Sequence, residues 1–477
     1  MTKKSQLLTF IESRVRCNIC LDQNSYLFGC CDRNFWHYKI RDFSSIILQQ
    51  GAEVEFRRLQ RTNKKEARKF ALGAINFWSN RAVMRNSFEE YYPFEDGYPP
   101  LAFSTLSIVR IIKLAKIKIN EVPLLKKALE KSSEKLLKRR EVQALNQYSA
   151  AIAALAGLTK LEVFGTSEVK FRKKLNDFLS YQTVEGWFPE YGSYDIGYLS
   201  VTLDCLWDVY DDYPSAELLK SITQASDFIA SILSIQRVSF GKFNSRNTDY
   251  VLPYGLLRTF CLNPTENLRL ALIQIEEKSQ LYNSLDDRYL MHYIGISLIR
   301  SQNLFLRKIP KLNSVQKDGA LAKKKYELAG IYRVKYKEEL GWLNIRKGVI
   351  CSKNYSEWGF RIMVDGEIYE TGVVPMSGDK NKTLDGFQVS LTKLNEFVPS
   401  FVKLTIIKIL AFFFGFRLIE FLKKRVIHRT DSKAMMSYDE RLGLSLISTG
   451  FDESKAILIS KSPPQSIRHV ASAEWNL

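Results

Sequence analysis

The chain has 477 residues, of which 45% are hydrophobic and 25% charged, and this balance excludes an extensively disordered protein. Its length predicts two domains. The 70 Lys and Arg residues against 51 Asp and Glu residues give a formal net charge of +19, which favours an anionic partner such as nucleic acid, an acidic membrane surface or an acidic glycan. Because the basic residues are scattered and no nucleic-acid motif accompanies them, we do not expect nucleic acid.

The N-terminal region carries no pattern for export. Three charged residues between positions 12 and 16 interrupt the apolar run that a secretory signal needs. The seven cysteines are an odd number and do not form a disulfide framework. Cys17 and Cys20 resemble half of a zinc site, but no second pair with this spacing follows. We therefore expect a cytoplasmic protein without metal or cofactor, with peripheral contact at the inner membrane as an option.

Residues 1–60 are expected to pack on the domain that follows. They begin with a short amphipathic helix, and residues 29–43 then gather a histidine, aromatic side chains and charges. His37 in this cluster is a candidate for binding substrate, with a hydrogen-bonded structural histidine as the alternative.

Residues 61–306 predict a helical domain of about ten to twelve helices, because apolar residues recur at helical spacing between short polar turns. No fixed sequence period indicates a solenoid. An irregular bundle and a closed α/α toroid are the two remaining solutions. The clearest predicted helices are residues 67–78, 101–115, 122–137, 142–156, 171–181, 199–210, 216–233, 268–275 and 289–304.

Two loops in this domain combine aromatic and acidic residues. In residues 87–100, Glu89, Tyr91 and Glu95 are candidate substrate-binding residues. The carboxylates of this loop, Glu89, Glu90, Glu95 and Asp96, could face Glu190 and Asp195 of the second loop, which would suit hydrolysis of a glycoside by two carboxyl groups. This alternative needs both loops at the same end of the domain.

The second loop, residues 185–198, holds three glycines, a proline and five aromatic residues. Such a segment should be an ordered loop rather than a helix. Trp187, Glu190 and Asp195 suit the rim of a sugar-binding cleft, where rings stack on sugars and carboxylates accept hydroxyl protons. A tightly packed turn between helices is the alternative.

The composition changes after residue 306. Residues 307–327 are polar and basic, as in a linker, and residues 328–477 predict an antiparallel β domain. Asp365 and Gly366 form a typical hairpin turn. The predicted strands are residues 330–336, 341–346, 349–352 and 358–364.

Residues 401–427 are an exception within the β domain, because they predict an inserted amphipathic helix. Lys403, Lys408, Arg417 and Glu420 interrupt the apolar run too often for a membrane span. We expect the helix to be buried against the β domain, with contact at a membrane surface as the alternative.

Three segments, residues 146–156, 185–198 and 246–255, together resemble the heparinase II/III-like group of polysaccharide lyases, of the type associated with polysaccharide-biosynthesis genes. The resemblance covers most of the chain. It implies an α+β multidomain fold, in which an N-terminal (α/α) toroid is followed by an antiparallel β-sandwich. The order of helices and strands inferred above agrees with that arrangement.

The resemblance also implies β-elimination on a uronic-acid-containing glycan, an anionic polysaccharide or oligosaccharide. This chemistry needs a group that neutralises the uronate carboxylate, a base for the C5 proton and an acid for the leaving oxygen. By position, Asn146 resembles the neutralising asparagine. Tyr198 resembles the catalytic tyrosine, with Tyr191 as the competing choice. Arg246 or His292 would assist the tyrosine.

Gln147 stands where many relatives have histidine, so the base remains open and we assign Gln147 to substrate binding. A C5-epimerase, which removes the same proton without elimination, is a related option. The lack of histidine at this position also favours an inactive or repurposed domain. The non-catalytic alternative is a glycan-binding or assembly protein at the cytoplasmic membrane face.

Overall fold

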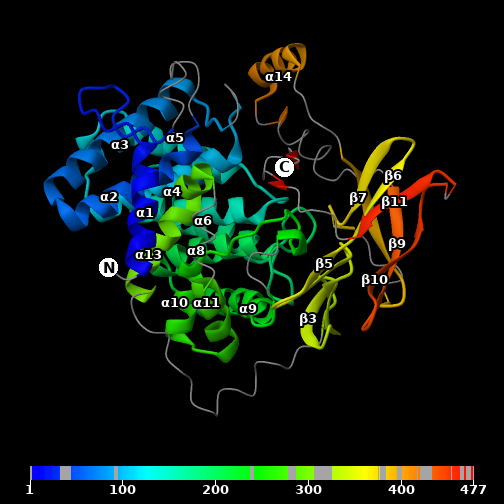
Figure 1. The fold of residues 1–477 in the computed structure, drawn as a ribbon. Helices are drawn as coiled ribbons and strands as arrows, with labels where there is room; N and C mark the ends of the chain where they lie inside the picture. Colours follow the sequence, from blue (N-terminus) through cyan, green and yellow to red (C-terminus); the bar gives the residue numbers. More distant parts are fainter. Residues whose placement is uncertain are drawn as a thin grey trace.

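The computed structural model describes residues 3–32, 45–90, 95–236, 241–277, 286–305, 325–373, 375–376, 383–394, 400–415, 417–418, 432–452, 454–461, 467–468 and 474–475. A helical part extends to Phe305, and antiparallel sheets follow from Lys325 (Figure 1). This order confirms the predicted sequence of helices and then strands. Of the linker predicted at 307–327, only 325–327 are described.

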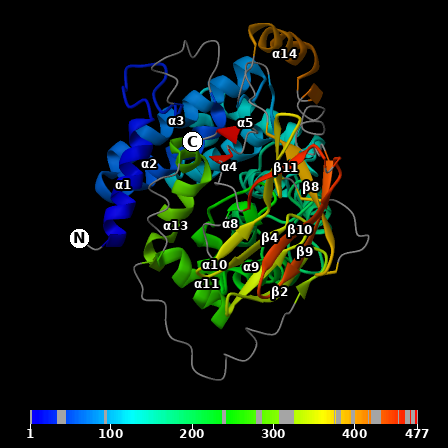
Figure 2. The ribbon, with the colours of Figure 1, turned by 45° about the vertical axis from the view of Figure 1, so that its right-hand side comes forward.

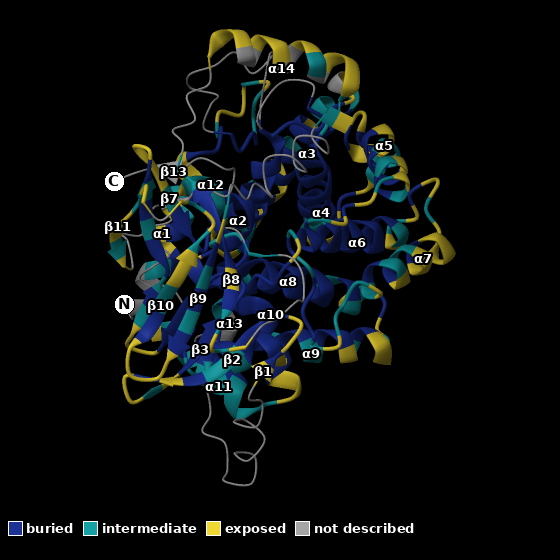
Figure 3. Cartoon of the chain, turned by 90° about the vertical axis from the view of Figure 1, so that its right-hand side faces the viewer, coloured by how far each residue is buried: buried dark blue, intermediate teal, exposed yellow. Residues whose placement is uncertain are grey.

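Six helices form a closed circle of contacts, in which each helix touches the next and the last touches the first. We call them the central helices. Figure 3 shows several of them as the buried interior of the helical part. In order, they are α2 (Gln50–Thr62), α4 (Tyr98–Ala115), α6 (Leu145–Lys160), α8 (Ile196–Asp212), α10 (Pro253–Leu262) and α13 (Gly295–Phe305).

The remaining long helices contact the central helices from other sides. The nine helices predicted from apolar spacing all coincide with helical segments, whereas α2 and α10 were not predicted. The domain boundary drawn at residue 60 falls inside α2. The other helices are α1 (Lys3–Cys17), α3 (Lys64–Arg85), α5 (Leu125–Lys138), α7 (Glu168–Leu179), α9 (Ala216–Leu233), α11 (Glu266–Glu277) and the short α12 (Asp287–Tyr289).

Local sequence explains where several helices begin. The side chains of Asn63, Ser167 and Ser215 accept hydrogen bonds from the first turns of α3, α7 and α9, which satisfies backbone N–H groups that have no partner within the helix. Asp195 does the same for α8. Helix α4 begins with prolines at its first positions, where a missing N–H costs nothing.

Four of the central helices begin at the same end of the circle. The start of α6 contacts Glu190, just before α8, and Tyr198 at the start of α8 lies beside Tyr250, just before α10. Tyr250 in turn contacts Tyr293, just before α13. We call this the N-terminal end of the central helices.

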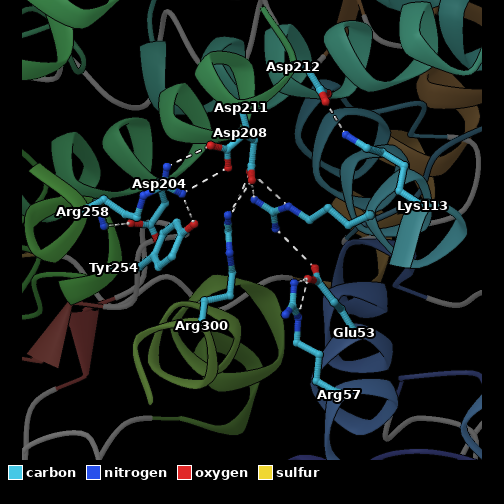
Figure 4. Close-up of polar contacts among 12 residues, drawn as sticks. Glu53, Arg57, Lys113, Asp204, Asp208, Asp211, Asp212, Tyr254, Arg258 and Arg300 are labelled. Atoms are coloured by element: carbon cyan, nitrogen blue, oxygen red, sulfur yellow. Dashed lines mark hydrogen bonds and ion pairs between the residues drawn. The ribbon is translucent and has the colours of Figure 1, made fainter. Parts of the chain in front are cut away.

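The opposite end of the central helices holds a network of partly buried charges (Figure 4). Asp208 of α8 accepts hydrogen bonds from Arg110 of α4 and from Arg300 of α13, the latter at 2.5 Å. Arg110 also reaches Glu53 of α2 at 3.4 Å. Burial alone would raise the pKa of Asp208, but the guanidiniums of Arg110 and Arg300 hold it below its ordinary value of 3.8. One carboxylate therefore links three central helices directly.

The strands form one sheet in the order β1-β2-β3-β4-β5 and another in the order β10-β9-β8-β7-β6-β11, all antiparallel. Buried side chains from both sheets share one core. The strands are β1 (Lys325–Tyr326), β2 (Ile331–Tyr336), β3 (Glu339–Asn344), β4 (Val349–Ser352), β5 (Ser356–Trp358), β6 (Phe360–Val364), β7 (Glu367–Thr371), β8 (Phe387–Lys393), β9 (Ser432–Asp439), β10 (Gly443–Thr449), β11 (Ala456–Lys461) and the separate pair β12 (Ile467–Arg468) and β13 (Glu474–Trp475).

The predicted hairpin turn is confirmed. Val364 at the end of β6 pairs with Glu367 at the start of β7, and the two residues between them have φ angles of 50° and 79°. A two-residue turn of this kind needs positive φ at both positions, which Asp365 and Gly366 tolerate.

The β part lies against the helical part beside α9 (Figure 2). A buried ion pair joins Lys242 to Glu370 at 2.6 Å, and the Lys347 ammonium donates to the Asn244 carbonyl at 2.6 Å. Glu185 accepts two backbone hydrogen bonds from residues 328 and 329. The loops around residues 185 and 244 are thus held from the β side as well as from the helices.

The helix predicted within residues 401–427 is present as α14 (Phe401–Phe414), but the expectation that it is buried is wrong. Phe401 is 84% exposed and Phe413 72% exposed, and Figures 1 and 3 show the helix standing apart from both sheets. Among the described residues, no helix is long and apolar enough to cross a membrane.

We predict that Asp208→Asn lowers the free energy of unfolding by about 3–5 kcal/mol, because it leaves two largely buried guanidiniums without their shared carboxylate. Since the pKa of Asp208 is lowered in the folded state, this stabilisation is present above the ordinary pKa of 3.8 and is lost as the pH falls below it. Urea unfolding at neutral pH measures the effect.

Asp211→Asn is the matched control. Asp211 pairs with Arg258, but its side chain is 46% exposed, so we expect a loss below about 1 kcal/mol. Equal losses in the two variants would show that the buried network does not hold the helices together.

Candidate functional site

The candidate site lies at the N-terminal end of the central helices, where Asn146, Tyr198 and His292 stand near the starts of α6, α8 and α13. Tyr198, Tyr250, Tyr293 and His292 form a continuous series of ring contacts. Asn146 joins the same region through the loop that precedes α8. Residues predicted from three distant segments therefore meet at one end of the helical part.

Asn146 is 4% exposed, in the first turn of α6. Its backbone N–H donates to Glu190 Oε1 at 2.6 Å. The Glu190 carboxylate therefore pairs with an N–H group that has no partner within the helix, and its negative charge lies at the positive end of the helix dipole. The side-chain Oδ1 of Asn146 has no hydrogen-bond partner among the described residues. Gln147, next along the helix, is half-buried. Asn146 and Gln147 thus place two side-chain amide groups at the start of α6, and the hydrogen bond to Glu190 holds this part of the helix in position.

Asp195 is fully buried and connects two loops. Its carboxylate accepts hydrogen bonds from the backbone N–H groups of Tyr198 at 3.1 Å and Arg246 at 3.0 Å, and from the Thr248 hydroxyl. Burial raises its pKa, and these hydrogen bonds oppose the rise. A substrate hydroxyl would have to displace those partners, so this geometry assigns Asp195 to positioning rather than to the binding predicted for it.

Tyr191 and Arg246 are half-buried and lie against each other. The guanidinium of Arg246 is 4.6 Å from the centre of the Tyr191 ring. Tyr191 has a φ of 52° and Asn247 a φ of 55°, and for a tyrosine this left-handed conformation is strained. Strain of this kind persists where neighbouring contacts hold the backbone, as at many functional sites. The two side chains form a half-buried border of the site with a positive charge.

His292 lies in a π-helical segment, η6 (Leu290–Ile294), which leads into α13. Its ring packs edge-on against Phe103 with the ring centres 4.4 Å apart. Burial, together with the positive charge of Arg288, lowers its pKa well below the ordinary value of 6.5. Its Nε2 has no hydrogen-bond partner among the described residues. The imidazole is therefore neutral at pH 7.

The pKa values of the tyrosines beside His292 are shifted in the opposite direction. Burial raises the pKa values of Tyr198, Tyr250 and Tyr293 well above 10.0, so all three remain protonated at neutral pH. The hydroxyls of Tyr250 and Tyr293 share a short hydrogen bond. A neutral base and protonated phenols side by side are the combination that acid–base chemistry requires.

Sequence reasoning missed Tyr250 and Tyr293. Tyr250 lies within the segment 246–255 that carried part of the resemblance, and Tyr293 follows His292 directly. Their proximity in sequence to predicted residues was a usable signal. Their contact with each other depends on the packing of α10 against α13.

Trp187 belongs to the core rather than to an open rim. It is 5% exposed, its ring lies near Tyr194 and Phe228, and its indole N–H donates to Glu185 at 2.9 Å. Phe188 is likewise buried and stacks on Phe178. For these aromatic residues the loop is the tightly packed turn that was the alternative, and this packing argues against Trp187 stacking on a sugar.

The acidic residues of the loop before α4 are also buried and engaged. Glu95 Oε2 accepts the Glu90 N–H at 2.7 Å, Glu89 lies 3.7 Å from Arg81, and Glu90 pairs with Arg288 at 2.5 Å. This last contact places Arg288, whose side chain is 26% exposed, beside the site. Tyr91 and His37, both predicted to bind substrate, lie outside the described residues.

A cavity of about 280 Å³ lies next to the charged network at the other end of the central helices. Its charged lining residues form ion pairs with one another or with Glu53 and Arg258. The cavity is therefore a weaker candidate than the N-terminal end. Within the described ranges, no group of three or more His, Cys, Asp or Glu side chains could hold a metal ion.

Comparison with protein-family models, curated proteins and solved structures gave no match to the chain. The functional interpretation therefore depends on the residues of the site.

We predict that His292 keeps a neutral imidazole between pH 8 and pH 5.5, because the burial that lowers its pKa persists over this range. The chain has four histidines, so NMR of protein labelled with ¹³C at histidine can follow each ring, and His292→Gln assigns the signal. A His292 signal that titrates near 6.5 would contradict the buried, neutral assignment.

Proposed function

We propose that this protein removes the C5 proton from a uronic acid in an anionic polysaccharide and acts as a lyase in polysaccharide biosynthesis or modification. The observation that carries the proposal is the buried imidazole of His292, whose Nε2 has no partner among the described residues, in a series of ring contacts with Tyr293, Tyr250 and Tyr198. Buried acid–base pairs with shifted pKa values are typical of catalytic sites.

On this proposal each residue has a defined task. The amide of Asn146, with Gln147 beside it, would donate to the uronate carboxylate and so stabilise negative charge that develops when C5 is deprotonated. His292 Nε2 would take the C5 proton, which supplies the base that Gln147 leaves unassigned. Tyr198 would give its phenolic proton to O4 as the C4–O4 bond breaks and the C4–C5 double bond forms.

The positive side chains at the border would guide the substrate. Arg246 and Arg288 are both partly exposed beside the tyrosines, and a guanidinium recognises carboxylates in a fixed, planar geometry. The net charge of +19 would add long-range attraction for a polyanion.

The same reasoning extends to the fold. We propose that the closed circle of central helices is an (α/α) toroid and that the two sheets with a shared core are a β-sandwich. Inner helices that start at one end, with loops between them that meet the β part, would suit a long polymer lying across that end.

Hydrolysis by two carboxylates is less well supported. Glu190 and Asp195 each hold backbone N–H groups, and Glu95 and Glu90 are engaged as described above. An inverting pair needs one carboxylate free to bind water and another free to donate a proton. A C5-epimerase would use the same first step as the lyase and is kept as a variant of the proposal.

We predict that Tyr198→Phe lowers turnover about 100-fold to 10,000-fold, since it removes the proton donor. Asn146→Ala should cost about 100-fold to 1,000-fold, the usual effect of losing one donor to a developing negative charge. The measurement is the ultraviolet absorbance of the unsaturated product from a panel of uronate-containing polysaccharides.

The matched control is Tyr254→Phe, the same substitution at a tyrosine whose side chain lines the cavity beside the charged network, where its hydroxyl accepts a hydrogen bond from Arg258. It should turn over at the wild-type rate. Activity that survives in Tyr198→Phe but falls in Tyr254→Phe would move the site to that cavity.

A further inference from the structure

Helix α14 carries more exposed apolar surface than a surface helix needs. Scattered exposed apolar residues are normal, but a contiguous apolar patch marks an interaction surface. The exposed fractions of its large apolar side chains lie between 50% and 84%. These residues are Phe401, Val402, Ile406, Ile409, Phe412, Phe413 and Phe414.

Most of these side chains share one face of the helix. At about 100° per residue, all of them except Phe414 fall within an arc of roughly 140° around the helix axis. Thr405, which is also exposed, is the polar residue within this arc. The face is therefore a broad, exposed apolar stripe, and Phe412 and Phe413 are its last two residues.

Helix α14 is too short to span a lipid bilayer. Its 14 residues span about 21 Å at 1.5 Å per residue, less than the hydrocarbon core of about 30 Å. The helix is therefore too short to cross the bilayer, and its exposed apolar face suits insertion at the boundary between head groups and tails.

The sequence around the helix supplies the matching charge. Residues 401–427 contain six basic residues and one acidic residue, Glu420. Two of the basic residues are within α14, and three follow one another at Lys423, Lys424 and Arg425. Apolar side chains next to a basic segment suit an anionic bilayer, where lipid tails receive the former and head groups attract the latter.

We propose that α14 docks the protein on the surface of an anionic lipid bilayer. The apolar face enters the interface between head groups and tails, and the net positive charge of the sequence around α14 attracts negatively charged lipid. The helical part and the sheets stay outside the bilayer. This docking is independent of the uronate chemistry, so either proposal can fail without the other.

The test is sedimentation of the full chain with vesicles of phosphatidylcholine alone or with a third of the lipid replaced by phosphatidylserine. We expect binding to the anionic vesicles that weakens as salt rises, and weaker binding to the neutral ones. The double variant Phe412→Asp, Phe413→Asp should bind the anionic vesicles at least about tenfold more weakly, because it places two charges in the apolar face.

Phe164→Asp is the matched control, because Phe164 is 80% exposed on the helical part, outside α14. It should bind as the wild type does, and equal thermal unfolding of all three proteins should show that they are folded. The proposal is overturned if wild-type protein ignores anionic vesicles or if the double variant binds them equally well. Dimers of the wild type that the double variant abolishes, without vesicle binding, would assign the face to a second copy of the chain instead.

Discussion

The helical part depends on a largely buried carboxylate shared between two guanidiniums. Asp208 joins Arg110 and Arg300, and through Arg110 it reaches Glu53, so that charges on four central helices compensate one another. A buried ion network of this kind is a weak source of net stability, but a missing member leaves a charge unpaired. The network therefore fixes which central helices are neighbours at one end. At the other end, contacts made by the loops hold the helices.

At the loop end, the carboxylates of Glu190 and Asp195 accept hydrogen bonds from backbone N–H groups. The Glu190 carboxylate accepts a hydrogen bond from a backbone N–H at the start of α6. The Asp195 carboxylate accepts hydrogen bonds from a backbone N–H at the start of α8 and from the N–H of residue 246. The β part adds Lys347 and Asn344, which bond to the segment at 243–247 and to Tyr194. Loops supported from both sides are rigid enough to position acid–base groups, which catalysis requires. Under the proposed function, this is why the sheets accompany the helices.

The sequence predicted the parts of the fold that depend on local pattern. Residues 216–233 match α9 at both ends, because apolar spacing and the Ser215 cap agree. Helix α2 was missed because its sequence is highly charged, and only the folded structure shows that Glu53 and Glu55 are buried. For α14 the pattern gave the helix but not its environment, since an apolar face looks the same whether protein or solvent lies beside it.

The sequence was sufficient to predict which residues lie at the candidate site, but not what each of them does there. Asn146, Tyr198, Arg246 and His292 all lie near one end of the central helices, yet spacing could not show that Asp195 and Glu190 are occupied by backbone groups. The low pKa of His292 and the contact between Tyr250 and Tyr293 arise from burial among side chains distant in sequence. Such properties depend on tertiary packing.

The central claim is that His292 removes a proton from C5 of a uronic acid. The most direct measurement is hydrogen exchange at C5 when uronate polysaccharides are incubated with the protein in D₂O, followed by mass spectrometry or NMR. The claim predicts deuterium at C5, or an unsaturated product that has lost the C5 hydrogen, with wild-type protein and neither with His292→Gln. Exchange or elimination that proceeds equally with His292→Gln would contradict it.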